Sequence, residues 1–326
     1  MSRFDPGTIT NRLAIQAGMK VNRQTILGKQ AITDFIATHP EIFEKIDVDS
    51  LAGSEMQYGY THQGALAKIG FKEKQIQRIV IETKIPEFTR YRLNVAYDGS
   101  DFFGFQTQKQ GRTVQSELNR IFSDLHQYPT ICQGASRTDT GVHALNQVVH
   151  VDSPYRFSRE KWLTILKQKC PKDLTVTDIM PVHPLFHARY DVLGKEYRYR
   201  LNLSAYDPLE RMREWTVDDV DCARLEAELR TVEGTHDFTS FSKGFKEDNV
   251  RTIFHTELLK QDSRVELVFV GNGFLHYMVR ILVAQLVLIA KGKNLATISE
   301  LLAEKSRKHT GKVAPPQGLY LAKVIY

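Results

Sequence analysis

The hydrophobic periodicity changes repeatedly along the chain, and this most constrains the fold. Apolar and polar residues alternate over residues 90–97, which is strand periodicity. Apolar residues then recur at helical spacing from Val114 to Leu125, after Thr113, a suitable N-cap. Strands are predicted around 130–135 and 146–152, a helix between Ser158 and Pro171, and a strand at 174–179. The order strand, helix, strand, strand, helix, strand is that of a split βαβ unit.

The remaining residues repeat this theme less regularly. We predict strands at 195–203, 250–259, 265–270 and 319–325, and helices at 220–232, 275–290 and 298–305. Two such halves, each ferredoxin-like or RRM-like, can join edge to edge. The predicted fold class is therefore α/β (α+β), with one mixed, mostly antiparallel sheet flanked by helices and a cleft between the halves.

The domain organisation follows from the change in pattern near residue 90. Residues 1–88 are interpreted as an N-terminal extension of unknown role, mostly helical, with helical spacing at 30–46 broken by Pro40 and a further helix at 71–84 that could run into a strand. Residues 89–195 form the first predicted half and residues 196–326 the second.

The composition restricts the class of protein. Among 326 residues, 42% are hydrophobic and 25% charged, as in soluble globular proteins, and the longest apolar run, residues 281–290, is too short to span a bilayer. We therefore expect a buried helix there and no membrane association. No apolar signal core follows the N-terminus, and the three cysteines form no C-x-x-C pair. These features predict a cytoplasmic protein without a disulfide framework or a metal site.

The charge balance is mildly basic, with a net charge of +6 and a pI of about 9.0. This is compatible with a polyanionic partner but is weak evidence alone. The excess is shared between residues 1–90 and the rest, so any basic surface must come from folding.

One loop carries a candidate reactive group. In residues 134–144, Asp139 lies between Gly134 and Gly141, two residues after Arg137, and a predicted strand follows at once. Irregular loops held by regular structure are common places for reactive side chains. A surface turn in which an aspartate caps its own backbone would look similar.

Five segments in order resemble the tRNA pseudouridine synthase A family. They are residues 98–118, the loop 134–144, residues 186–199, residues 271–280 and residues 314–321, so that the resemblance covers about residues 91–326. It implies isomerisation of uridine to pseudouridine in tRNA, at positions 38–40 of the anticodon stem-loop. It also implies a homodimer that holds tRNA, and a redox-neutral reaction that needs no cofactor.

The resemblance assigns the chemistry to four residues. Asp139 matches the catalytic aspartate, and a carboxylate can act as a nucleophile, although the sequence leaves open whether it attacks the sugar, attacks the base or assists sugar deprotonation. Arg137 matches an arginine that helps to extrude the target nucleotide. Arg280 would pair with Asp139 and keep it ionised. Tyr197 would stack on the detached uracil and relay the proton from C5.

Further candidates for substrate or RNA contacts are Gln106, His143, Gln147 and Leu321. For His143 a structural role is at least as plausible, and Gln106 and Gln147 could instead order the loop. Each of the four main residues also has a plain alternative: a capping aspartate, a solvated Arg137, an Arg280 that reaches solvent, and a strand tyrosine that only packs.

The main alternative function is a non-catalytic RNA-binding or tRNA-folding protein on the same scaffold. A second is an RRM-like module of another class, which would need an RNP1-like run of sheet aromatics. We find no such run in the sequence.

Overall fold

The computed structural model describes residues 88–183, 186–244, 248–294 and 296–326. The helices predicted at 30–46 and 71–84 lie outside the described residues. Among the described residues, no helix is long and apolar enough to cross a membrane, and no group of three or more His, Cys, Asp or Glu side chains is placed to hold a metal ion.

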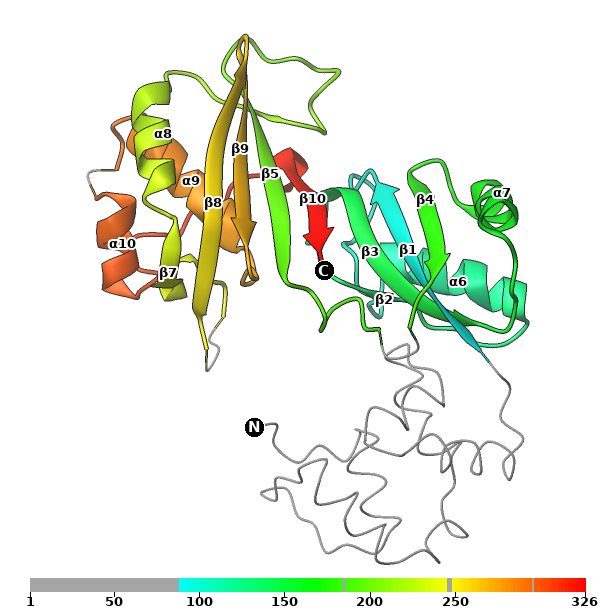
Figure 1. Cartoon of the computed structure of the whole chain (residues 1–326). Helices are drawn as coiled ribbons and strands as arrows, with labels where there is room; N and C mark the ends of the chain where they lie inside the picture. Colours follow the sequence, from blue (N-terminus) through cyan, green and yellow to red (C-terminus); the bar gives the residue numbers. More distant parts are fainter. Residues whose placement is uncertain (1–87, 184–185, 245–247, 295) are drawn as a thin grey trace, which may run out of the picture.

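One mixed sheet runs through the described chain, in the order β4-β1-β3-β10-β5-β9-β8-β7 (Figure 1). Its strands are β1 (Thr89–Tyr97), β3 (His143–Ser153), β4 (Leu174–Pro181), β5 (Gly194–Asn202), β7 (Gly234–Asp237), β8 (Val250–Gln261), β9 (Arg264–Gly271) and β10 (Leu319–Ile325). The two-residue strands β2 (Gln133–Gly134) and β6 (Trp215–Thr216) pair with β3 and β5. The predicted fold class is confirmed.

The C-terminal strand makes the join at the centre of the sheet. β10 lies parallel to β3, with Tyr320 opposite His143, and antiparallel to β5, with Leu321 opposite Tyr197. All other main-path pairs are antiparallel. The sheet is therefore mostly antiparallel, and the strands at 143–153 and 194–202 meet through β10 rather than directly.

Five α-helices of the described residues flank the sheet: α6 (Val114–His126), α7 (Arg159–Lys169), α8 (Cys222–Arg230), α9 (Met278–Ala290) and α10 (Ile298–Glu304). In Figure 1, α6 and α7 lie beside β1 and β4, whereas α8, α9 and α10 gather beside β8 and β7. The Trp162 ring of α7 lies 5.4 Å from Tyr91 of β1 and 5.9 Å from Phe122 of α6, measured between ring centroids. Trp162 therefore packs α7 against both β1 and α6.

Most predicted elements are present, and their ends differ by a few residues. Thr113 caps α6 and Ser158 caps α7 as predicted, because each side chain accepts a hydrogen bond from the third backbone amide that follows. The helix predicted from Leu275 begins at Met278, since Tyr277 takes the left-handed conformation with a φ of 63°. The run 281–290 forms a buried helix, as predicted.

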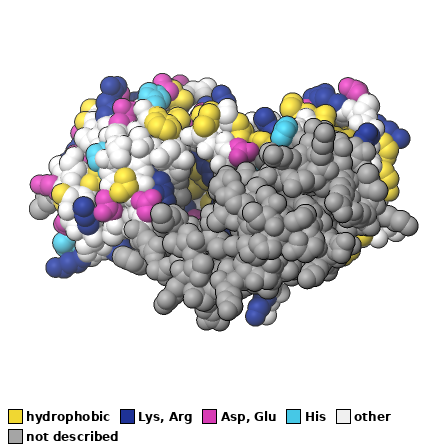
Figure 2. All heavy atoms as spheres, turned by 60° about the horizontal axis from the view of Figure 1, so that its bottom comes forward, with side chains coloured by type: hydrophobic (Ala, Val, Ile, Leu, Met, Phe, Trp, Pro, Cys, Tyr) yellow, Lys and Arg dark blue, Asp and Glu magenta, His cyan; other side chains and the backbone are white. Residues whose placement is uncertain are grey.

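Charge is not concentrated on the visible surface. In the view of Figure 2, the Lys and Arg side chains of the described residues are scattered over the left and right parts of the visible face, with Asp and Glu among them. The net positive charge is thus not gathered into one patch on the described part of that face.

Candidate active site

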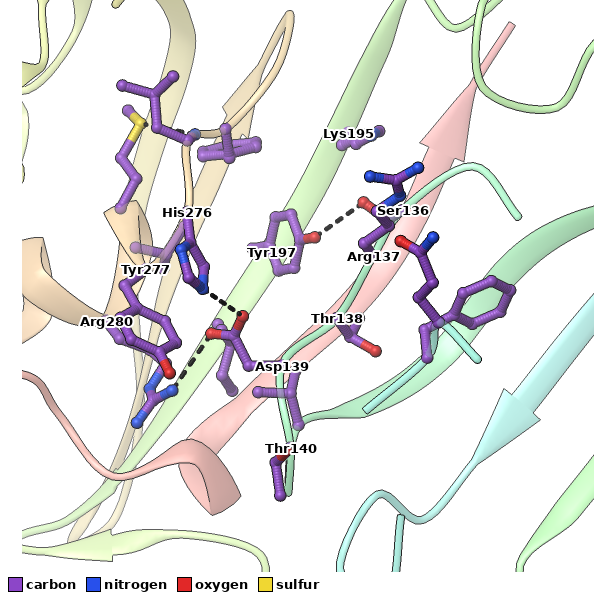
Figure 3. Close-up of a pocket in the computed structure, with 18 of the residues that line it drawn as sticks. Ser136, Arg137, Thr138, Asp139, Thr140, Lys195, Tyr197, His276, Tyr277 and Arg280 are labelled. Carbon is purple, nitrogen blue, oxygen red and sulfur yellow. Dashed lines mark hydrogen bonds and ion pairs between the residues drawn. The ribbon is translucent and has the colours of Figure 1, made fainter. Parts of the chain in front are cut away.

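A cavity of about 580 Å³ brings together side chains from distant parts of the sequence. Its wall includes the loop before β3, strand β5, the start of α9 and Leu319 of β10 (Figure 3). Its size is within the range typical of ligand pockets. Of the residues singled out from the sequence, it brings together Asp139, Arg137, Arg280, Tyr197 and Gln106.

Hydrogen bonds from several elements hold the loop that carries Asp139. Gln147 of β3 accepts from the backbone amide of Ser136 at 3.0 Å and donates to its carbonyl oxygen at 2.8 Å. The hydroxyl of Tyr97 lies 2.7 Å from the hydroxyl of Thr138, and the amide of Phe105 donates to the carbonyl oxygen of Thr138. The loop is therefore irregular but fixed, so it can present Asp139 without reordering.

Asp139 forms an ion pair with the first turn of α9. The Arg280 Nη1 atom lies 3.2 Å from Asp139 Oδ2, and both side chains are largely buried. Arg280 Nε also donates to the carbonyl oxygen of Ala314 at 2.8 Å, which fixes the guanidinium. The predicted pairing of these residues is confirmed.

The pKa of Asp139 is raised above its ordinary value, because burial outweighs the opposing charges. Arg280 lowers the pKa most among the charged neighbours, followed by His276 and Lys243. Arg280 therefore favours the ionised carboxylate, as expected, but it does not fully offset the rise in pKa that burial causes. A carboxyl group with a raised pKa, held in a cavity, can serve in proton transfer or as a nucleophile.

His276 is a site residue that the sequence reasoning did not single out. Its Nε2 atom lies 3.8 Å from Asp139 Oδ1, whereas Arg280 hydrogen bonds Oδ2. Its side chain is 50% exposed, and its ring packs on Tyr277 with the centroids 4.2 Å apart. The sequence did offer one indication of a role in the site, because His276 lies in the segment 271–280, which also carries Arg280.

Tyr197 forms part of the cavity wall, and its hydroxyl group is already hydrogen bonded. It lies 2.9 Å from the hydroxyl of Ser136, and the ring packs edge-on against Phe274. Burial raises the pKa of Tyr197 to about 12, so the phenol is neutral at physiological pH. Tyr199, which has the same strand parity, donates to the carbonyl oxygen of Pro315 and is fully buried. Tyr199 is thus a packing residue.

Arg137 and Gln106 both line the cavity and have exposed side chains. Residues 136–139 do not form a strand, so the two-residue spacing of Arg137 and Asp139 does not place them on one face. In Figure 3, Arg137 lies on the side of Tyr197 away from Arg280.

Three other predicted site residues lie outside the cavity wall. His143 is buried: its Nδ1 accepts from the amide of Gly99, its Nε2 lies 2.8 Å from the carbonyl oxygen of Met212, and its ring stacks on Tyr320. Gln147 is fully buried and holds Ser136, which corresponds to the loop-ordering alternative. Leu321 is fully buried in β10, and Leu319 contacts the cavity instead. None of the three lines the cavity, and a direct substrate contact by any of them stays a prediction.

Comparisons with known proteins identify relatives over the described region. A family model described as tRNA pseudouridine synthase matches residues 94–191 and 229–326. The chain is 41% identical to "tRNA pseudouridine synthase A" of Geobacillus sp. over 244 residues, which cover 73% of this chain and 98% of that protein. It is 41% identical to the protein of that name in Oceanobacillus iheyensis, over 73% and 96%, and 35% identical to that in Staphylococcus aureus, over 72% and 90%.

Proposed function

This chain belongs to the tRNA pseudouridine synthase family, and on that premise we propose that it isomerises uridine to pseudouridine in tRNA. The single observation that best supports this activity is the ion pair between Asp139 and Arg280 in the wall of a cavity. The reaction breaks the bond between C1′ and N1, turns the uracil and joins C1′ to C5. It neither oxidises nor reduces the substrate, so it needs no redox cofactor.

Asp139 is proposed as the catalytic carboxylate. Arg280 hydrogen bonds Oδ2, whereas Oδ1 has only His276 Nε2 near it, at 3.8 Å, so we propose that Oδ1 faces the substrate. Whether the carboxylate bonds to the ribose, bonds to the base or takes a proton from the sugar, it must be ionised at the start. Since burial raises its pKa, activity is expected to fall as the pH drops through that raised value.

Tyr197 is proposed to bind the detached base, and Arg137 to stabilise the RNA from which the nucleotide is extruded. Both N1 and C5 of a stacked uridine are hidden, so the target nucleotide must leave the stack before reaction. The neutral Tyr197 ring offers a surface on which the detached uracil can stack, and Arg137 can replace stacking lost in the RNA. With a pKa of about 12, the phenol of Tyr197 gives up its proton only weakly. If Tyr197 relays the proton from C5, the relay therefore depends on its hydrogen bond to the hydroxyl of Ser136.

Several finer expectations are part of this proposal. We propose the anticodon stem-loop, positions 38–40, as the target region, a homodimer as the active form and the cytoplasm as the location. The division at residues 89–195 and 196–326, with a separate role for residues 1–88, also stays a proposal. Gln106, exposed at the cavity, is proposed to contact RNA.

The activity is tested with tRNA transcripts tritiated at C5 of uridine. Isomerisation at C5 must release the tritium, so the wild-type chain is expected to release it in proportion to the pseudouridine formed. Binding of tRNA without tritium release from any transcript would favour the alternative, a non-catalytic RNA-binding or tRNA-folding protein.

Gly104 provides a test of loop placement. Its φ is +84°, and a Cβ atom built there would lie 2.8 Å from the carbonyl oxygen of Thr138, so Gly104→Ala must shift the loop. We expect turnover to fall by on the order of 100-fold, because catalysis depends on placement within about 1 Å. The free energy of unfolding is expected to fall by more than about 1 kcal/mol.

Gly292→Ala is the matched control for Gly104→Ala. Gly292 has a φ of +67°, but a Cβ atom there would meet nothing within 4 Å. It should reproduce the backbone strain with little loss of turnover. Equal losses of tritium release in the two variants would mean that contact with Thr138 does not position the loop.

A further inference from the structure

Cationic side chains line the part of the cavity away from Arg280. Lys195 of β5, Arg189 from the segment before β5 and Arg137 of the loop all contribute to the wall. In Figure 3, Lys195 and Arg137 lie on the other side of Tyr197 from Arg280. Among the described residues that line the cavity, Asp139 alone has an acidic side chain, and it is paired with Arg280. The lining therefore carries positive charge that its own carboxylate does not balance.

The ammonium group of Lys195 has hydrogen-bond donors available for a ligand. Its Nζ atom donates to the carbonyl oxygen of Ala135 at 2.8 Å, its one hydrogen bond to the described residues. An ammonium group has three donors, so two remain. Its sheet neighbours in register, Val324 of β10 and Gly271 of β9, are uncharged. A partly buried ammonium without a carboxylate partner is costly, and a bound anion would offset that cost.

We propose that Lys195 and Arg189 form a subsite for one backbone phosphate of the RNA, next to the nucleotide whose base enters the cavity. The inference rests on the proposed function, since it takes RNA as the ligand. A phosphodiester is the anion that RNA carries at every nucleotide, whereas uracil offers only neutral carbonyl groups at neutral pH. A guanidinium and an ammonium together suit phosphate oxygens. Phosphate at this end and Asp139 at the other would orient the nucleotide.

The subsite should make RNA affinity depend on pH. Burial, and next the charge of Arg189, lower the pKa of Lys195 to about 8. Arg137 and Tyr197 also line the cavity, and the phenol of Tyr197 stays neutral because its pKa is about 12. The other charged or titratable groups of the described lining are Asp139, His276, Tyr277 and Arg280. Phosphate binding favours the ammonium form, so above about pH 8 binding must take up a proton and affinity falls. Lys195→Arg stays charged and should remove that decline.

The test measures dissociation constants of the full chain for a synthetic anticodon stem-loop by fluorescence anisotropy. A series of RNAs carries one neutral methylphosphonate each, moved through the loop. Lys195→Met should weaken binding of the unmodified RNA by about tenfold, as expected for one charge-assisted contact. If the methylphosphonate replaces the phosphate that Lys195 contacts, the wild-type chain should lose the same tenfold in affinity for that RNA. On that RNA, Lys195→Met should cause no further loss of affinity. The salt slope should decrease by about 0.7.

The matched control is Lys161→Met, which removes an exposed lysine from α7, outside the cavity wall. It should leave the dissociation constants unchanged. If Lys195→Met weakened the binding of every methylphosphonate RNA equally, Lys195 would not be coupled to one phosphate. This result would overturn the subsite and leave Lys195 only as a hydrogen-bond donor to the carbonyl oxygen of Ala135. So would a Lys195→Arg variant that binds no better than Lys195→Met.

The proposed function can fail separately. A wild-type chain that binds with the predicted phosphate coupling but releases no tritium from any tRNA would overturn the activity and leave the subsite standing. A wild-type chain that binds neither the stem-loop nor full-length tRNA transcripts would overturn both.

Discussion

Asp139→Asn is expected to reduce tritium release from C5-labelled tRNA by at least about 1,000-fold. Asparagine keeps the shape of the side chain and can still accept a hydrogen bond from Arg280, but it has neither the charge nor the nucleophilic oxygen of a carboxylate. The affinity for tRNA should change by less than about threefold, because the proposed RNA contacts lie elsewhere in the cavity. Single-turnover release and anisotropy measure the two effects separately.

Asp178→Asn is the control for Asp139→Asn. Asp178 lies on β4 and pairs with Arg159 at 2.6 Å, away from the cavity wall. The control should keep full activity. If Asp139→Asn retained tritium release, the carboxylate would have no part in the reaction. If it lost tRNA binding and thermal stability instead, Asp139 would be a structural residue that holds α9 against the loop.

Local periodicity was sufficient to predict most of the fold. The alternation in residues 90–97 identified β1 because one face of that strand is buried and the other is not. The apolar run 281–290 identified α9 because this helix is covered almost all round. By contrast, β7 (Gly234–Asp237) was missed. It is short and polar, and its backbone pairing with β8 leaves no hydrophobic signature.

The site was predictable only where residue chemistry and family resemblance agreed. Asp139 and Arg280 are 141 positions apart, and no spacing rule links them, yet a charge on an apolar helix needed a partner. His143 was singled out because it follows the loop, and Leu321 because of the family resemblance. Neither signal shows that both side chains are buried, His143 beside backbone groups and Leu321 within β10. His276 gave no periodic signal because its side chain is half exposed.

Arg280→Met is expected to lower turnover by on the order of 100-fold at neutral pH and to move the acid limb of the pH–rate profile upward. Burial already raises the pKa of Asp139, and Arg280 is the strongest influence that opposes it. Without Arg280 the carboxyl group stays protonated to higher pH, so activity should recover in part as the pH is raised. Arg280→Lys keeps the charge and should shift the limb less.

Stability gives an independent readout of the same pair. A carboxyl group whose folded pKa lies above its unfolded value destabilises the fold when it ionises, and this cost grows as the pH rises from the unfolded to the folded pKa. Arg280→Met should widen that window, so its free energy of unfolding should fall over a wider pH range, and by more in total, than that of the wild type. In the Asp139→Asn background the additional loss caused by Arg280→Met should vanish, since residue 139 no longer titrates. Arg264→Met, which removes a half-exposed arginine paired with Glu214, should change neither the acid limb nor turnover. An acid limb that does not move in Arg280→Met would show that Asp139 is not the group that titrates in the reaction.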